Sequence, residues 1–210
     1  MAILMHLNTL KPTQQELLPR LVKLPDFYLA GGTALALQIG HRISDDFDLF
    51  SDKALSTGLL KKVETVFSVP NIAVDVNTTD ELSVRINGVS VSFVYYPFPP
   101  LLPLVQLGPL SALSVSEIAA TKAYAIGRRR ELKDYIDLFT IFSQRLANPK
   151  DTISLAKQKF GDAFNARLYL EQLLDFKNIP QDKPVNFLGS APTQTEMQQL
   201  FEEMVKKVSL

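Results

Sequence analysis

Apolar and polar positions alternate with a changing period along the first part of the chain, and each change of period predicts a new element. The run Phe27–Ala30 is short and apolar, as expected of a buried strand, and it leads into a glycine pair. The stretch after the glycines, through Leu37, predicts a short apolar helix. Acidic and apolar residues then alternate from Asp46 to Phe50, which is the period of a strand. The expected order is strand, glycine turn, helix, turn, strand.

The flanking segments extend this pattern in both directions. Thr13 with Glu16 three residues later predicts a capping box for a first helix. Ser56 or Thr57 is expected to cap a second helix that runs to Phe67 and stops at Pro70. Three strand-like runs follow, at residues 72–76, 82–86 and 89–95. The dipeptide Asn87-Gly88 between the last two is a strong hairpin signal.

Five prolines between residues 97 and 110 mark the expected boundary between two parts of the chain. We expect a core domain over residues 1–108 and a helical domain over residues 109–210. Helices are expected after a cap at Ser114 or Ser116, then at 134–142, 151–159, 164–176 and 193–208. The predicted fold class is therefore α/β (α+β): a small mixed sheet flanked by helices, followed by a helical bundle.

Composition narrows the classes of function. The 210 residues carry 22 basic and 22 acidic side chains, so the protein has no strongly basic composition for non-specific nucleic-acid binding. Any binding of a polyanion would depend on a local basic patch. The sequence holds no cysteine, which excludes disulfides and thiolate metal sites. No apolar run is long enough to span a membrane. We expect a cytoplasmic protein.

Asp46 and Asp48 are the first candidates for chemistry. Residues i and i+2 of a strand point to one face, so both carboxylates should project together while Phe47 and Leu49 pack behind them. Two like charges held that close repel unless a cation lies between them, and oxygen-only ligands suit Mg²⁺. The alternative is an acidic surface turn.

The glycine turn supplies the second set. Gly31 and Gly32 would let backbone approach phosphate oxygens, at the N-terminus of the following helix. Thr33 would add a hydroxyl donor, and Arg42 would pair with a triphosphate or with Asp46. The alternatives are a tight strand-to-helix turn and an ordinary salt bridge.

A glycine pair followed by Asp-x-Asp between apolar residues resembles the signature of polymerase-β-like nucleotidyltransferases. The longer string GGTALALQIGHRISDDFDLF is similar to the AbiEii/AbiGii toxin-type nucleotidyltransferases. This resemblance implies a nucleotidyltransferase sheet with a helical partner that completes a nucleotide cleft. It further implies Mg²⁺ as cofactor, a nucleoside triphosphate as substrate, tRNA or another RNA as acceptor, and a cognate antitoxin protein as partner.

A second block, Lys122 to Asp137, matches the same family, in which a helix lysine, an arginine and Lys-Asp-x-x-Asp recur. The resemblance implies that Lys122 reaches the triphosphate, that Arg129 and Lys133 flank it, and that Asp134 orients the basic groups. Lys122 and Arg129 are seven apart and would share a helix face. The alternative is a solvated charged corner between helices.

One departure from the superfamily stands out. Many polymerase-β-like enzymes place a third carboxylate on a later strand, where it serves as base for the incoming hydroxyl. The corresponding strand, residues 89–95, offers Ser90 and Ser92 instead, and Asp75 would substitute only if its strand lay adjacent. Two further hypotheses therefore stay open: a relative that binds nucleotide without transferring it, and a non-catalytic partner-binding protein.

Overall fold

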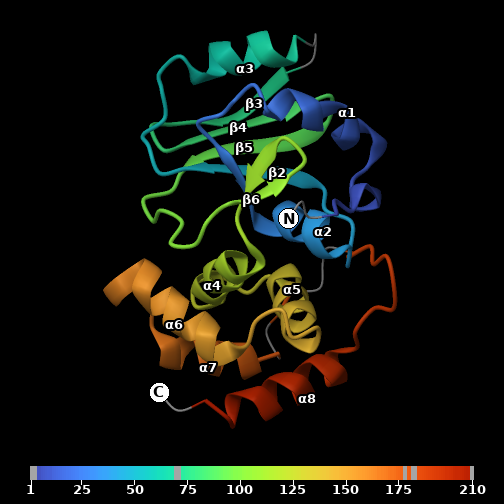
Figure 1. The fold of residues 1–210 in the computed structure, drawn as a ribbon, viewed down its shortest axis with the longest axis vertical. Helices are drawn as coiled ribbons and strands as arrows, with labels where there is room; N and C mark the ends of the chain where they lie inside the picture. The colour runs from blue at the N-terminus through green and yellow to red at the C-terminus, as the bar shows by residue number, and fades with distance from the viewer. Residues whose placement is uncertain (1–3, 69–71, 177–178, 181–183, 209–210) are drawn as a thin grey trace. The chain divides into compact units, whose positions relative to one another are not determined.

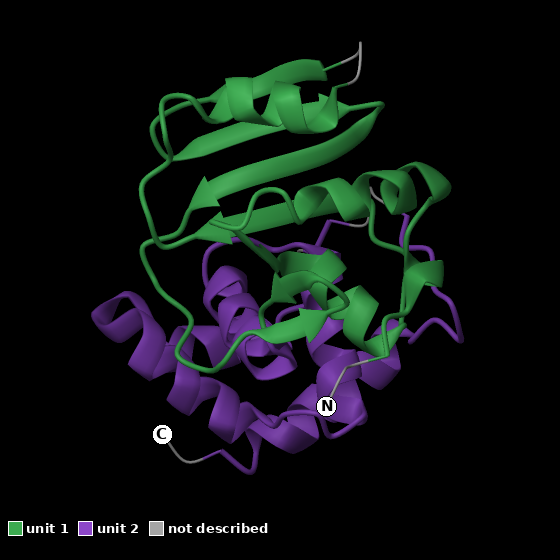
Figure 2. Ribbon diagram, turned by 45° about the horizontal axis from the view of Figure 1, so that its top comes forward, with its two compact units in different colours: residues 1–113 green, residues 114–210 purple. Residues whose placement is uncertain are grey.

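The computed structural model describes residues 4–68, 72–176, 179–180 and 184–208. It divides into two compact units, residues 1–113 and 114–210 (Figure 2). The first unit is built on a sheet and the second is helical, so the α/β class with a helical C-terminal part is confirmed. The expected helix stop at Pro70 lies outside the described residues.

Among the described residues of the first unit, seven strands form one mixed sheet in the order β3-β4-β5-β2-β1-β7-β6. The parallel pairs are β2 with β5 and β1 with β7, and the other neighbours are antiparallel. The strands span Tyr28–Ala30 (β1), Asp46–Ser51 (β2), Ile72–Asn77 (β3), Glu81–Ile86 (β4), Val89–Tyr95 (β5), Val105–Leu107 (β6) and Leu110–Ala112 (β7).

The described part of this unit also contains a 3₁₀ turn and three α-helices: η1 (Leu7–Thr9), α1 (Pro12–Leu21), α2 (Gly31–Ile39) and α3 (Leu59–Phe67). Helix α1 packs against α3, α3 packs on β4, and α2 packs on β1 and β2 (Figure 1). The predicted capping box of the first helix is wrong by two residues: Lys11 is the N-cap, and the side chain of Gln14 accepts its backbone N–H at 3.0 Å. Pro12 at the first helical position favours this earlier start.

One face of the central strands forms the core of the unit. Phe47 and Leu49 on β2 are buried, as are the alternate apolar residues of β4 and β5. Asn87 and Gly88 both have positive φ, 50° and 82°, which is the two-residue turn that matches strand twist. The predicted hairpin is therefore confirmed, and the opposite face of the same strands carries the half-buried Asp46, Asp48, Ser90 and Ser92.

The first unit ends later than the predicted boundary. The sequence prediction ended the core domain at residue 108, whereas the sheet continues through a hairpin of β6 and β7. Strand β7 pairs in parallel with β1, through Ala112 opposite Leu29. Each of these strands has three residues and they lie among the prolines, so no alternating pattern announced them.

The second unit contains the helices α4 (Val115–Ile126), α5 (Leu132–Ser143), α6 (Pro149–Phe160), α7 (Ala166–Leu174) and α8 (Gln194–Val205), with a 3₁₀ turn η2 (Gly161–Ala163). Ser114 caps α4, because its hydroxyl accepts the N–H of Glu117. Thr193 and Glu196 form a capping box at α8. No helix among the described residues is long and apolar enough to cross a membrane.

Candidate active site

Asp46 and Asp48 project from the same face of β2. The exposure of successive side chains alternates along this strand: Asp46 and Asp48 are half-buried, while Phe47 and Leu49 are buried. The strand lies between β1 and β5, so its position is fixed by hydrogen bonds on both sides. The predicted common orientation of the two acids is thus what the strand produces.

The glycine pair is shaped by the acids and by Arg42. Gly31 has φ +64°, a conformation that favours glycine, and a Cβ there would collide with the carboxylate of Asp48. A Cβ on Gly32 would stand 2.5 Å from Nη2 of Arg42. The glycines are therefore required for two charged side chains to approach the start of α2, which no side chain caps.

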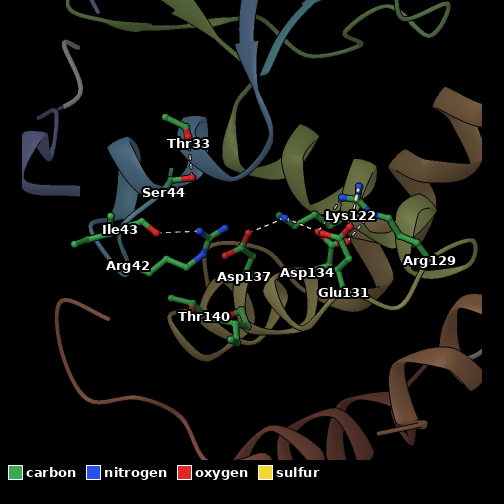
Figure 3. Close-up of polar contacts among 11 residues, drawn as sticks. Thr33, Arg42, Ile43, Ser44, Lys122, Arg129, Glu131, Asp134, Asp137 and Thr140 are labelled. Atoms are coloured by element: carbon green, nitrogen blue, oxygen red, sulfur yellow. Dashed lines mark hydrogen bonds and ion pairs between the residues drawn. The ribbon is translucent and has the colours of Figure 1, made fainter. Parts of the chain in front are cut away.

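Arg42 and Thr33 are both buried, at 1% exposure each. Arg42 donates from Nη1 to the carbonyl oxygen of Ile43 at 3.1 Å (Figure 3). The hydroxyl of Thr33 lies 2.7 Å from Oγ of Ser44 and also contacts the carbonyl oxygen of Asp46. Thr33 thus ties α2 to the start of β2, a structural use of the hydroxyl that the sequence did not reveal.

The neighbouring strand β5 places serines beside the acids. In the parallel pairing of β2 and β5, Asp46 stands opposite Ser90 and Asp48 opposite Ser92. The expectation that residues 89–95 form the adjacent strand is confirmed, and this strand contributes no carboxylate. Neighbouring strands lie about 4.8 Å apart, so Ser90 and Ser92 stand beside the acid pair.

Asp75 does not substitute for the third carboxylate. It lies on β3, which is separated from β2 by β4 and β5. Three strand spacings amount to about 14 Å. Its carboxylate is also paired with the guanidinium of Arg85 at 2.7 Å. The alternative that Asp75 joins the acid pair is therefore wrong.

In the helical unit, Lys122 of α4 is held between two carboxylates of α5. Its Nζ lies 2.8 Å from Oδ1 of Asp134 and 2.6 Å from Oδ2 of Asp137, and the side chains are only 7%, 2% and 0% exposed (Figure 3). Asp137 was not among the predicted site residues, although its i+3 spacing from Asp134 was visible in the sequence. The cluster fixes the ammonium group firmly.

Arg129 reaches the same cluster by a different route from the one predicted. Helix α4 ends at Ile126, so Arg129 lies beyond it and does not share a helix face with Lys122. Its Nε donates to Oδ2 of Asp134 at 3.1 Å, while its side chain remains 55% exposed. The premise of a continuous helix was wrong because Gly127 ends α4 before the arginine.

The other two arginines of this block brace the helices. Arg128 donates to the carbonyl oxygen of Ala163 at 2.6 Å and covers the ring of Tyr124. Arg130 pairs with Asp175 at 2.9 Å and also donates to Gln172. These contacts favour a structural use of both guanidinium groups.

The two carboxylates of Asp46 and Asp48 are the kind of donor set that Mg²⁺ uses in proteins. Among the described residues no three His, Cys, Asp or Glu side chains gather in one place, so Asp46 and Asp48 are a two-carboxylate donor set. Mg²⁺ is usually bound by one or two carboxylates together with phosphates of the substrate and water. The two carboxylates present therefore fit this ion.

Comparisons with known proteins agree with this geometry. A family model described as "Nucleotidyl transferase AbiEii toxin, Type IV TA system" matches residues 15–209. A protein of Aquifex aeolicus, aq_aa25, is 28% identical over 206 residues, covering 96% of this chain and 98% of its own length.

Two solved structures share the fold. MenT4, the nucleotidyltransferase toxin Rv2826c of Mycobacterium tuberculosis, has a TM-score of 0.57 at 18% identity, covering 94% of this chain and 83% of that one. JHP933 from Helicobacter pylori has a TM-score of 0.52 at 16% identity, covering 93% of each chain. At these identities the likeness concerns the fold.

Proposed function

The chain belongs to the AbiEii family of nucleotidyltransferase toxins, and from this premise we propose that it transfers a nucleoside monophosphate from a triphosphate to an acceptor hydroxyl, releasing pyrophosphate. The observation that carries the proposal is the common orientation of Asp46 and Asp48 beside the start of α2. The family description names a toxin–antitoxin system, so a cognate antitoxin is the proposed partner. RNA, such as tRNA, is the proposed acceptor.

Asp46 and Asp48 are proposed to hold Mg²⁺, which would neutralise triphosphate charge and acidify the attacking hydroxyl. The protein itself would position the triphosphate and supply positive electrostatic potential. The N-terminus of α2 is proposed to attract the triphosphate, and the buried guanidinium of Arg42 beside Gly32 is proposed to add positive charge there. Gly31 and Gly32, whose missing Cβ atoms make room for Asp48 and Arg42, are proposed to let both charged groups stand close to the backbone that faces the triphosphate.

Lys122 is proposed to bind the triphosphate as well, with Asp134 and Asp137 fixing its ammonium group and Arg129 adding positive charge. Phosphoryl transfer depends mainly on such positioning and on electrostatic stabilisation, because the transferred group needs little covalent help from the protein. An ammonium group that is already held in place needs less reorganisation free energy as the transition state forms than a mobile one.

The test is transfer of label from α-³²P nucleoside triphosphates to total RNA in the presence of Mg²⁺. The double variant Asp46→Ala/Asp48→Ala should lose transfer by at least about 10³-fold, since it removes the proposed metal ligands. Asp75→Ala is the matched control, because it removes a carboxylate from the same sheet at a strand outside the site. Transfer that survives the double substitution would refute the role given to the acids.

A second candidate is a nucleotide-binding relative without transferase chemistry. The observation that favours it is the serine pair opposite the acids, where a third carboxylate is common in the superfamily. Calorimetric binding of triphosphate without pyrophosphate release, across a panel of RNA acceptors, would support this candidate over the enzyme.

A further inference from the structure

The polar face of the sheet carries a chain of hydrogen bonds that begins beside the acid pair and ends on a carboxylate. Ser92 of β5 stands opposite Asp48 on one side and opposite Ser83 of β4 on the other. The two serine oxygens are 2.9 Å apart, and Oγ of Ser83 lies 2.6 Å from Oε1 of Glu81. These two contacts thus link Ser92, which stands beside Asp48 in the register, to Glu81 on the neighbouring strand. No local motif singled out this glutamate.

The direction of these hydrogen bonds follows from counting protons. A serine hydroxyl has one proton to donate, and an ionised carboxylate can only accept. Ser83 therefore gives its proton to Glu81, so Ser92 must be the donor in the contact between the two serines. With its own proton directed at Ser83, Ser92 presents lone pairs to any further hydroxyl at the acid pair.

We propose that Ser92 accepts the proton of the attacking hydroxyl and that a proton is relayed through Ser83 to Glu81. This hydrogen-bonded path would replace the third carboxylate of the superfamily. The proposal rests on the proposed nucleotidyl transfer. As the acceptor oxygen bonds to the α-phosphorus, the bond from that phosphorus to pyrophosphate breaks. The acceptor proton moves to Ser92, the Ser92 proton to Ser83, and the Ser83 proton to Glu81.

Burial supports a chain that excludes bulk water from its middle. Ser83 is 8% exposed, Ser92 is half-buried, and Leu82 and Val84 beside Ser83 are buried on the opposite face. A hydrogen bond to an ionised acceptor is shorter and stronger than a neutral one, which is consistent with the 2.6 Å contact at Glu81. The alternative is a plain cross-strand serine pair, which would stabilise the sheet and leave catalysis untouched.

Glu81→Gln is the primary variant, because the amide oxygen can still accept from Ser83 but cannot take a proton. We expect kcat for label transfer to fall by about 10²-fold, the usual scale of general base catalysis, with KM for the nucleotide and the melting temperature unchanged. Ser83→Ala should give a similar loss, and Ser83→Thr, which keeps the hydroxyl, should restore most of it. Asp80→Asn removes one negative charge from the preceding turn and is the matched control.

Two further readouts separate a proton path from a structural contact. The double variant Glu81→Gln/Ser83→Ala should be no slower than either single variant, because both interrupt one path. The dependence of kcat on the deuterium fraction of the solvent should be curved for the wild type, indicating several protons in motion, and linear for Glu81→Gln.

The outcomes distinguish the proposal from its premise. If the wild type transfers label and Glu81→Gln stays within about threefold of Asp80→Asn, the proton path is wrong while the transferase function stands. Additive losses in the double variant would overturn it in the same way. If the wild type transfers nothing to any acceptor, the proposed function fails and the proton path fails with it.

Discussion

Gly31→Ala is the substitution whose effect can be worked out most directly from the structure. The residue has φ +64°, and a Cβ would collide with the carboxylate of Asp48, the residue opposite the end of β1. Holding an L-residue in this region costs about 1–2 kcal/mol. The collision is relieved by moving the end of a side chain, which is cheap in free energy but displaces a proposed metal ligand.

Stability and activity should therefore separate. Natural domains are stable by about 5–15 kcal/mol, so a loss of about 1–2 kcal/mol leaves more than about 99% of the protein folded. A shift of about 1 Å in a positioned catalytic group can cost 10²-fold in rate. We expect Gly31→Ala to transfer label about 10²-fold more slowly than the wild type while its unfolding midpoint in urea changes only slightly.

Gly88→Ala provides a matched control. Gly88 has φ +82°, so alanine meets a similar backbone cost, but a Cβ there would find no atom within 4 Å. Both variants should lose similar stability by urea denaturation, and only Gly31→Ala should lose transfer. Equal activity of the two variants would mean that Asp48 does not need its observed position, and the proposed role of the glycine turn would be wrong.

Three further predictions concern the helical unit. Lys159→Met should cost about 3–5 kcal/mol in urea denaturation because it removes the ammonium group that lies 2.5 Å from the buried carboxylate of Glu117. Adding Glu117→Leu should recover most of the loss. Lys122→Met should destabilise far more than Arg129→Met, since Lys122 is 7% and Arg129 55% exposed; equal losses would contradict the burial argument. Burial raises the pKa of Tyr135 from 10.0 to about 12. The neutral phenol therefore stabilises the fold fully below pH 10, and this stabilisation is lost as the pH rises toward 12. In thermal melts, Tyr135→Phe should show a smaller loss of stability over this pH range.

The sequence predicted the elements whose signals are local. The glycine turn between β1 and α2, the alternation along β2 and the hairpin at Asn87-Gly88 each depend on a few consecutive residues, and each was confirmed. The acid pair belongs to this class, because the period of a strand alone decides that Asp46 and Asp48 share a face. The cap at Ser114 is a local signal of the same kind.

The features that the sequence did not reveal depend on pairing between distant segments. Strands β6 and β7 have three residues each, too few for a period, and only their partners identify them as strands. Asp75 was excluded by the order of strands, which no local pattern encodes. The position of Arg129 depended on where α4 ends, and helix ends are the least certain part of any sequence pattern.

The glycine pair and the acid pair form one structural unit, because the glycines make room for the charged side chains. Antiparallel pairing sets Ala30 opposite Asp48, so the next residue, Gly31, has to make room for that carboxylate. Gly32 makes room for Arg42 in the same turn, which brings a positive and a negative group to the start of one helix. A motif spread over residues 31–48 is thus a single contact region in space. The register of β5 and β4 then places Ser92, Ser83 and Glu81 next to this region. Because register depends on pairing between distant segments, no local motif identifies the proposed proton acceptor on these strands.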